Sequence, residues 1–321
     1  MKPAITYSPA YTIVPTYECF NRCTYCNFRL DIGSAKNLST LEAKQIFKKL
    51  DPAKVVEVLI LSGEVHPDSI ERQNWFTKIH EIGELSLKLG FLPHTNAGVL
   101  TWSEMKQLKV TNVSMGLMLE QVQPKFLQTV HKYAPGKHPQ IRLQQLEWAG
   151  KLKIPFTTGL LLGIGETELD IKESLSAIAL IHRRWGHIQE VILQPHSVGN
   201  HQLQDIPTFN PNLLPQIITL AKKILPEDIS IQIPPNLVPE ANFLLDCLAA
   251  GATDLGGISP KDEVNPDYPH SDAEAIAEIL KSNGWRLEPR LPVYPRYYSW
   301  LSPRLQKAVD LIKQRNNFPN W

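Results

Sequence analysis

Three cysteines are the residues of this chain whose type and spacing most clearly permit chemistry. Cys19, Cys23 and Cys26 form a C-x3-C-x2-C run, so three of the four cysteines among 321 residues fall within eight positions. Three thiolates placed so closely can bind three irons of a cubane cluster and leave the fourth iron without a protein ligand. An open coordination position is where a metal centre performs chemistry. The spacing therefore favours a reactive iron–sulfur centre.

Two other interpretations of these cysteines remain open. A structural zinc site needs four ligands, and His66 or His94 could supply the fourth only through folding. A redox-active C-x2-C pair would use Cys23 and Cys26 and would not need Cys19. A disulfide within the run would leave an odd thiol.

The bulk composition indicates a globular protein with a large core. Hydrophobic residues make up 43% of the chain, and the formal net charge is +1 with no basic cluster, so we expect no binding to nucleic acid. No apolar run reaches the ~20 residues needed to cross a bilayer, and no apolar signal segment follows Met1. We therefore expect a cytoplasmic protein without membrane association, which also fits four cysteines in a reducing compartment. Cys247, in an apolar helical pattern, is expected to be a buried small side chain.

Apolar runs of strand length alternate with amphipathic stretches of helix length along the chain. The expected strands span about residues 11–17, 56–61, 91–94, 112–119, 156–162, 188–194, 229–233 and 253–255. The expected helices span about 39–50, 68–89, a stretch beginning at 101, 140–151, 167–185, 212–225, 240–250 and 272–283. Capping-box sequences open two of them, at Ser39 and at Thr101. Eight strand–helix units in series favour an α/β protein with a parallel (β/α)8 TIM-type barrel, and a doubly wound open sheet is the alternative.

The sequence gives no sign of a domain boundary. We expect one domain over residues 1–321, with a barrel core over about 8–283 and a short C-terminal extension over about 284–321. The extension is rich in arginine and aromatic residues, and we expect it to pack on the outside of the barrel or over one of its mouths.

Polar and glycine residues follow the expected strands, at the end of a barrel where enzymes place their catalytic loops. Each group has an alternative structural explanation. Ser62-Gly63-Glu64 could be a simple strand-ending turn, and Gly163 and Gly165 could merely shape a turn into the next helix. The histidines at the strand ends could be satisfied core residues. The shared position of these groups after successive strands is what indicates one site. The groups are Ser62-Gly63-Glu64, His94 to Gly98, Ser114 to Glu120, Gly159 to Thr167, Gln194 to Ser197, Pro234 to Asn236 and Gly256 to Glu263.

The cysteine run, with Tyr25 before its last member, resembles the signature of the radical S-adenosylmethionine (SAM) enzymes. The resemblance implies that Cys19, Cys23 and Cys26 bind a 4Fe–4S cluster and that SAM chelates its fourth iron. Ser62-Gly63-Glu64 is similar to that family's motif for the SAM amino group, with serine in place of the first glycine. By the same resemblance, the stretch with Gly163 and Gly165 would line the adenine, and Ser114 and Glu120 would meet the ribose.

A narrower resemblance covers nearly the whole chain. The stretches 93–100, 112–120 and 256–260 resemble the 7,8-didemethyl-8-hydroxy-5-deazariboflavin synthases, and within them the ring-closing subunit. This implies a lyase that acts on the adduct of a hydroxybenzyl group and a ribitylaminouracil. A 5′-deoxyadenosyl radical would abstract hydrogen, the ring would close and ammonia would be lost. The product would be the deazaflavin chromophore of coenzyme F420. A partner subunit would supply the adduct, and an external one-electron reductant would reduce the cluster.

Polar residues on the predicted loops are candidates for contacts to this small-molecule substrate, because its ribityl chain and uracil edges need many hydrogen-bond partners. Loss of ammonia also calls for a general acid, for which we select His196 or Asp262. The substrate candidates are His94, Asn96, Gln194, Asn236 and Lys261.

Three rival functions remain at this point. The chain could be the partner subunit that forms the adduct from tyrosine, or a different radical SAM barrel enzyme. It could also be an iron–sulfur electron carrier, although such carriers are usually small and close all four iron positions with cysteine.

Overall fold

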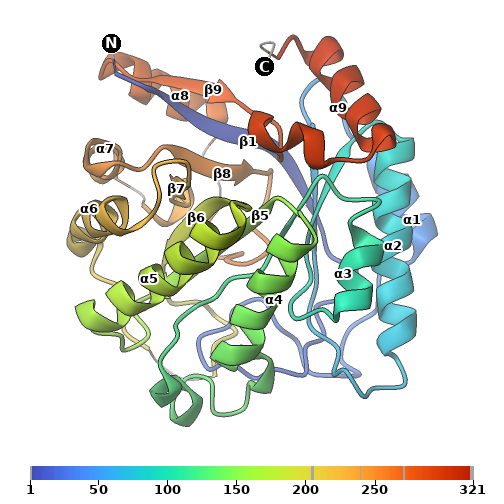
Figure 1. Ribbon diagram of the computed structural model, residues 1–321, viewed down its shortest axis with the longest axis horizontal. Helices are drawn as coiled ribbons and strands as arrows, with labels where there is room; N and C mark the ends of the chain where they lie inside the picture. Colours follow the sequence, from blue (N-terminus) through green and yellow to red (C-terminus); the bar gives the residue numbers. More distant parts are fainter. Residues whose placement is uncertain (1, 204–205, 239, 270–271, 319–321) are drawn as a thin grey trace.

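The computed structural model of the protein describes residues 2–203, 206–238, 240–269 and 272–318. Eight parallel strands form a closed barrel in the order β2–β3–β4–β5–β6–β7–β8–β1, and β2 pairs back with β1 (Figure 1). The predicted (β/α)8 barrel is confirmed, and the open-sheet alternative is wrong. The strands are β1 (Ala4–Ile13), β2 (Glu57–Leu61), β3 (Leu92–Asn96), β4 (Ser114–Gly116), β5 (Phe156–Leu162), β6 (Ile188–Pro195), β7 (Ser230–Gln232) and β8 (Asp254–Ile258).

Helices follow the strands and form the outer layer of the barrel (Figure 1). They are α1 (Thr40–Phe47), α2 (Arg72–Lys88), α3 (Trp102–Leu108), α4 (Pro139–Lys151), α5 (Glu168–Trp185), α6 (Leu214–Ile224), α7 (Ala241–Ala250) and α8 (Ala273–Ser282). Short 3-10 turns lie in the connecting loops at η1 (Pro124–Gln128), η2 (Pro135–Lys137), η3 (Pro211–Leu213) and η4 (Pro235–Leu237). None of the helices in the described ranges is long and apolar enough to span a bilayer.

Local sequence fixes where several helices begin. Ser39, Thr101 and Thr167 each accept a hydrogen bond from the backbone N–H three residues on, and the acidic residue there bonds back to the cap. These capping boxes satisfy backbone donors that a helix leaves unpaired at its start, a contribution of about 1 kcal/mol each. Gly186 ends α5 at φ +64°, a backbone conformation that favours glycine.

Two strands differ from the sequence prediction. The first begins at Ala4 and ends at Ile13, whereas residues 11–17 were expected. Pro9 and Ser8 discourage a strand by local preference, but pairing with β2, β8 and β9 (Arg286–Pro289) outweighs that preference. The fourth strand is only three residues long, Ser114–Gly116, in place of residues 112–119.

The apolar core lies between the strands and the helices, and the interior of the barrel is polar. Ile60 of β2 packs in one cluster with Ile79 and Ile82 of α2, all of them fully buried. Barrel interiors are usually filled by layers of branched apolar side chains. Here the inward positions of β2 and β6 begin with Glu57 and Glu190, both buried. Such an interior is suited to holding a polar ligand.

The segment after α8 covers the amino-terminal mouth of the barrel. β9 pairs with residues 4–7 of β1, along the same edge on which residues 10–13 pair with β2. η5 (Pro295–Trp300) and α9 (Pro303–Asn316) follow, and α9 lies beside α2 (Figure 1). The apolar side chains of this segment pack on Val56, Leu92 and Val113, which precede or begin β2, β3 and β4. The mouth opposite the catalytic loops is therefore closed by the end of the chain.

Arg290 extends from this segment into the barrel. Its Nε and Nη2 donate to the two carboxylate oxygens of Asp254 at 2.6 and 2.8 Å, and Asp254 is completely buried. Such bidentate pairing gives a fixed geometry as well as binding energy. The guanidinium also forms an ion pair with Glu190 of β6. The C-terminal segment thus supplies a charge to the interior of the barrel as well as a cover for it.

Candidate functional site

The three cysteines lie on the long loop between β1 and α1. The Cys19 N–H donates to Leu30 O at 3.2 Å, which folds the loop back on itself, and the Cys26 N–H donates to Cys23 O at 3.2 Å. The N–H of Glu64, at the end of β2, donates to Cys19 Sγ at 3.3 Å. The thiol loop is therefore fixed to the carboxyl end of the neighbouring strand.

A cavity of about 290 Å³ lies beside this loop, and we call it the thiol cavity. It brings together residues from the thiol loop and from the ends of β2, β4 and β6. The predicted site residues that line it are Cys19, Cys23, Tyr25, Cys26, Ser62, Gly63, Glu64, Asn96, Glu120, Gln194 and His196. Most of the predicted cofactor contacts thus share one space, although they come from distant parts of the sequence.

Glu64 is held in a tight, charged environment. One carboxylate oxygen accepts a hydrogen bond from Arg142 Nη2 of α4 at 2.9 Å, and both side chains are buried. A Cβ added at Gly98 would lie 2.0 Å from Glu64 Cγ, and one added at Gly136 would lie 2.6 Å from Glu64 Oε2. Only glycine fits at either place, so the chain approaches this carboxylate closely from two sides.

Glu120 forms a second buried pair in the thiol cavity, with Lys137 of η2. Its φ of +66° is a left-handed conformation that costs energy for any residue with a side chain. Burial acts to raise the pKa of Glu120, but the positive charges of Lys137 and Arg142 keep it below its ordinary value. Glu120 is therefore an anion held in a strained position facing the cavity.

The thiol cavity fits the groups that bind a cluster and SAM. Burial raises the pKa of Cys19 to about 11 and that of Cys23 to about 12, so iron must displace a proton from each thiol. Within the described ranges, no three Cys, His, Asp or Glu side chains are gathered around a single-ion site. A cubane does not require this, because each thiolate binds its own iron. Asn21 Nδ2, buried in the cavity wall without a partner, adds a free donor beside the charged groups.

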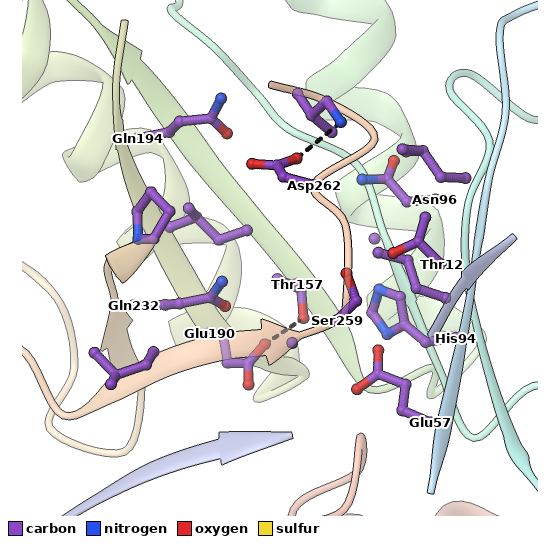
Figure 2. Close-up of a pocket in the computed structure, with 18 of the residues that line it drawn as sticks. Thr12, Glu57, His94, Asn96, Thr157, Glu190, Gln194, Gln232, Ser259 and Asp262 are labelled. Atoms are coloured by element: carbon purple, nitrogen blue, oxygen red, sulfur yellow. Dashed lines mark hydrogen bonds between the residues drawn. The ribbon is translucent and has the colours of Figure 1, made fainter. Parts of the chain in front are cut away.

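A second cavity of about 160 Å³ occupies the interior of the barrel, and we call it the interior cavity. Alternate residues of each strand face it, so its wall is built in layers. On β2 these residues are Glu57, Leu59 and Leu61, and on β6 they begin with Glu190 and end with Gln194. Figure 2 shows Glu57 and Glu190 at one end of the cavity and Gln194, Asn96 and Asp262 toward the other.

The two cavities adjoin and share part of their walls. The residues that line both are Leu59, Leu61, Asn96, Met118, Ile192, Gln194, Val264 and Asn265. Most of them are apolar, so a ligand that reached from the thiols to the carboxyl groups of Glu57 and Glu190 would pass through a mainly apolar ring. Such a ring excludes water from the space between the two polar ends.

His94 faces the interior cavity as a neutral hydrogen-bond acceptor. The Ser114 hydroxyl donates to Pro292 O, so its oxygen must accept the proton of His94 Nδ1, 2.7 Å away. Nε2 then carries a lone pair and lies against Gly116, where a Cβ would be only 3.0 Å from it. Burial lowers the pKa of His94 to about 3, and Arg290 adds to the effect.

Four predicted site residues lie outside both cavity walls. Ser114 is at the amino-terminal end of β4, bonded to the C-terminal segment and remote from the thiol loop. Gly163 and Gly165 have φ values of +96° and +103° and shape the turn after β5. Lys261 is exposed, with its Nζ 2.8 Å from Glu263 Oε2. The predicted roles of these four residues gain no support from their positions.

The two residues selected as general acids are occupied by the protein itself. His196 Nδ1 donates to Pro207 O at 3.2 Å, and Nε2 accepts from Gln202 Nε2 at 3.0 Å. Asp262 accepts four hydrogen bonds, from the N–H groups of Val264 and Asn265 and from the side-chain amides of Asn236 and Asn265. Both oxygens of Asp262 are therefore engaged by neighbouring protein groups.

Several residues of the two cavities were missed from sequence. They are Asn21, Glu57, Lys137, Arg142, Thr157, Glu190, Gln232 and Arg290. Glu57 and Glu190 could have been found, since each is a charged residue inside an otherwise apolar strand. Arg142 and Lys137 lie on a helix and a turn with no motif around them, and nothing local indicates that they reach the site.

Alanine in place of Gly63 is expected to separate the thiol loop from β2. A Cβ there would lie 2.1 Å from the backbone oxygen of Glu18, next to Cys19, so one of the two segments must move. Overpacking of this kind costs about 1–3 kcal/mol. The free energy of unfolding and the iron bound after anaerobic reconstitution should both fall in Gly63→Ala.

Gly83→Ala is the matched control, because Gly83 lies within α2 and its Cβ would be 3.3 Å from the Thr111 side chain. The better helix propensity of alanine, about 1 kcal/mol, offsets that contact. Normal iron content in Gly63→Ala would show that the close approach of Gly63 and Glu18 does not position the thiols.

Comparisons with known proteins agree with this site. Residues 13–178 match the Radical SAM superfamily, a range that includes the thiol loop, Glu64 and Glu120. A protein of Trichormus variabilis named 7,8-didemethyl-8-hydroxy-5-deazariboflavin synthase is 64% identical over 95% of this chain and 89% of its own length. One of the same name from Thermosynechococcus vestitus is 60% identical over 96% of this chain and 98% of its own length.

Solved structures show the same fold at low sequence identity. The FeFe-hydrogenase maturase HydG from Carboxydothermus hydrogenoformans superposes with a TM-score of 0.74 at 18% identity, over 99% of this chain and 79% of that one. Methylornithine synthase superposes with a TM-score of 0.70 at 17% identity, over 89% and 84%. The thiol loop, the barrel and these relatives lead to one conclusion: the chain belongs to the radical SAM superfamily and, within it, to the family of the 7,8-didemethyl-8-hydroxy-5-deazariboflavin synthases.

Proposed function

We propose that this protein is the radical SAM lyase that closes the ring of 7,8-didemethyl-8-hydroxy-5-deazariboflavin. Its substrate would be the hydroxybenzyl–ribitylaminouracil adduct, which closes to the deazaflavin with loss of ammonia. The names of the relatives support the product. The observation that carries the proposal is that the thiol cavity adjoins an interior cavity lined by buried polar and charged side chains, with eight residues common to both walls. This arrangement can hold a radical source at one end and a polar heterocycle at the other.

The thiol cavity would hold the cofactors. Cys19, Cys23 and Cys26 would bind three irons of a 4Fe–4S cluster, whose chemistry with SAM is one-electron cleavage of the sulfonium and hydrogen abstraction. The charged ends of SAM have matching partners here. Arg142 and Lys137 offer donors to its carboxylate, and Glu64 and Glu120 offer acceptors to its amino and ribose groups.

The interior cavity offers hydrogen bonds of both kinds to a uracil and a ribityl chain. His94 presents Nε2 as an acceptor, and the buried Asn236 Oδ1 has no partner. Asn96 and Gln194 lie where the two cavities meet, so they would contact the part of the substrate closest to the radical. The apolar side chains at that junction would keep water away from it.

The proposed reaction also needs partners that supply its reactants. A separate subunit would make the adduct, and an external one-electron reductant would reduce the cluster. Cys19 and Cys26 are partly exposed, which suits electron transfer from such a donor, whereas Cys23 is only 3% exposed.

An anaerobic assay with two substrate sets tests the proposal. The reconstituted protein, given SAM, reductant and the adduct, is expected to form fluorescent deazaflavin together with methionine and 5′-deoxyadenosine. Given tyrosine and ribitylaminouracil in place of the adduct, it should form none. Adduct formation from tyrosine would identify the chain as the first-step subunit. If the protein cleaved SAM with neither of the two substrate sets, the result would indicate that it catalyses a different radical SAM reaction.

A further inference from the structure

The floor of the interior cavity holds more acid than its one cation can neutralise. Glu57 of β2 and Glu190 of β6 line this floor, Asp254 of β8 binds the same cation, and all three are at least 94% buried. Among the described residues, Arg290 is the cation that the three share. Two further titratable groups face the cluster: His94, which is neutral, and the Tyr294 hydroxyl, 3.4 Å from Asp254 Oδ2.

Asp254 takes most of the guanidinium and is fully satisfied. Besides the two bonds from Arg290, it accepts the N–H of Gly256 at 2.6 Å and the hydroxyl of Thr6 at 2.5 Å. These four donors engage both oxygens of the Asp254 carboxylate. Asp254 does not line the interior cavity, so its role is to hold Arg290 and close the barrel.

Because Asp254 binds two nitrogens of the Arg290 guanidinium, this cation neutralises Glu57 and Glu190 only in part. Glu190 contacts Arg290 with one oxygen and accepts the Thr157 hydroxyl at 2.8 Å with the other. Glu57 has only the longer-range field of Arg290, because the buried Ser8 hydroxyl near it forms no hydrogen bond with any described residue. Both carboxyl groups line the cavity, and Figure 2 shows them at the same end of it. Burial raises the pKa of each, the charge of Asp254 raises both further, and the charge of Glu57 adds to the rise at Glu190. With one cation for three buried carboxyls, Glu57 and Glu190 are the side chains on which a proton would remain.

We propose that Glu57 and Glu190 form an acid–carboxylate pair that binds the amino nitrogen of the substrate and gives it the proton with which it leaves as ammonia. The inference rests on the proposed function, because it names the residues that perform its ammonia-loss step. It also replaces the two acids selected from sequence, since His196 and Asp262 have their polar atoms engaged by the protein.

The step balances within the pair and the substrate. As the carbon–nitrogen bond breaks, its electron pair stays on nitrogen, and the shared carboxylic proton completes ammonia. The pair is then doubly ionised and takes up a proton from an adjacent C–H or N–H of the substrate, as the double bond forms. The carboxyls end as they began, and no outside oxidant or reductant enters this step.

Glu57→Gln and Glu190→Gln test the assignment, because glutamine keeps the shape of glutamate and lacks its acidic proton. Three products are measured from the same anaerobic reaction with the adduct: 5′-deoxyadenosine, ammonia and deazaflavin. We expect ammonia and deazaflavin to form about 10²–10⁴-fold more slowly in at least one of these variants. Formation of 5′-deoxyadenosine should stay within about threefold of wild type, since cleavage precedes the loss of ammonia.

Glu147→Gln is the matched control. Glu147 also pairs with an arginine, Arg184, but it lies on α4 outside both cavities. All three of its products should form at the wild-type rate. Ammonia release at the wild-type rate in both Glu57→Gln and Glu190→Gln would overturn the assignment. So would a parallel fall of all three products in both, because it would show that the carboxyls support folding or substrate binding alone.

Infrared spectroscopy of the protein without substrate gives a second, independent readout. A protonated carboxylic acid has a C=O stretch that carboxylates and amides lack. We expect this band near neutral pH in the wild type and its loss in the double variant Glu57→Gln/Glu190→Gln. Absence of the band from the wild type would overturn the shared proton. If the wild type made no deazaflavin from the adduct, the proposed function would fail, while the infrared result would still decide the state of the pair.

Discussion

Replacing Cys23 with alanine is expected to abolish iron–sulfur binding and to lower SAM cleavage by more than about 10³-fold. Cys23 is the most deeply buried of the three clustered thiols, and its sulfur faces the thiol cavity. A cubane held by two thiolates would lose a third of its protein ligands and would open a second iron to solvent. The change is measured as iron and sulfide per chain after anaerobic reconstitution, followed by 5′-deoxyadenosine formation.

Cys247→Ala separates this effect from the general loss of a buried thiol. Cys247 is 1% exposed and packs in the apolar cluster of α7, away from the thiol cavity. Its replacement should cost about 1 kcal/mol of stability and leave the iron content unchanged. Wild-type SAM cleavage by Cys23→Ala would contradict the cluster assignment itself.

Replacing Arg142 with methionine is expected to reduce the free energy of unfolding by about 3–5 kcal/mol, because Glu64 would remain buried without its cation. Arg142 is 1% exposed and also donates to the backbone oxygens of Gly136 and Met118. It thereby ties α4 and the loop before it to the end of β4. Unfolding in urea, followed by circular dichroism, measures the loss. SAM affinity should fall about tenfold or more in the protein that remains folded.

Arg184→Met is the control for this prediction. Arg184 forms the same kind of pair with Glu147, but its side chain is 54% exposed. Exposed ion pairs contribute about 0.2–1 kcal/mol, so its loss should barely change the urea midpoint. Equal effects of the two substitutions would mean that the buried Glu64–Arg142 pair does not organise the site.

The order and type of the barrel elements could be predicted from sequence because the local signals agree with the tertiary structure. The strand expected at residues 156–162 is β5, with the same bounds. The capping sequences at Ser39 and Thr101 begin α1 and α3. The first strand could not be placed correctly, because Pro9 and the polar residues before it form a strand only through pairing with three neighbours.

The part of the site that a local motif encodes was also predictable. The three cysteines, Tyr25 and the Ser62–Glu64 segment line one cavity, as their place after successive strands indicated. Ser114 illustrates the limit of that argument. Its predicted role required a position near the carboxyl end of its strand. Ser114 is instead the first residue of β4, and its hydroxyl donates to Pro292 O at the amino-terminal end.

The partners that set charge in the site could not be predicted, since they depend on contacts between distant segments. Arg142 reaches Glu64 from a helix, 78 positions along the chain. Arg290 reaches Asp254 from a segment that carried no sign of a role in the barrel. Glu57 and Glu190 are different, because each is a charged residue beside the apolar residues of a predicted strand, and such a residue indicates a special role in the interior.

The C-terminal segment has a consequence for how the protein is made. A ribosome produces Glu57, Glu190 and Asp254 well before Arg290, which completes the barrel from below. Until that arginine emerges, the nascent chain has three acids to bury and no counter-ion for them, a burial that is strongly unfavourable. The interior can therefore exclude water only after Arg290 has been translated. Cofactor loading would then follow the translation of this segment, when the acidic end of the barrel has been neutralised and closed.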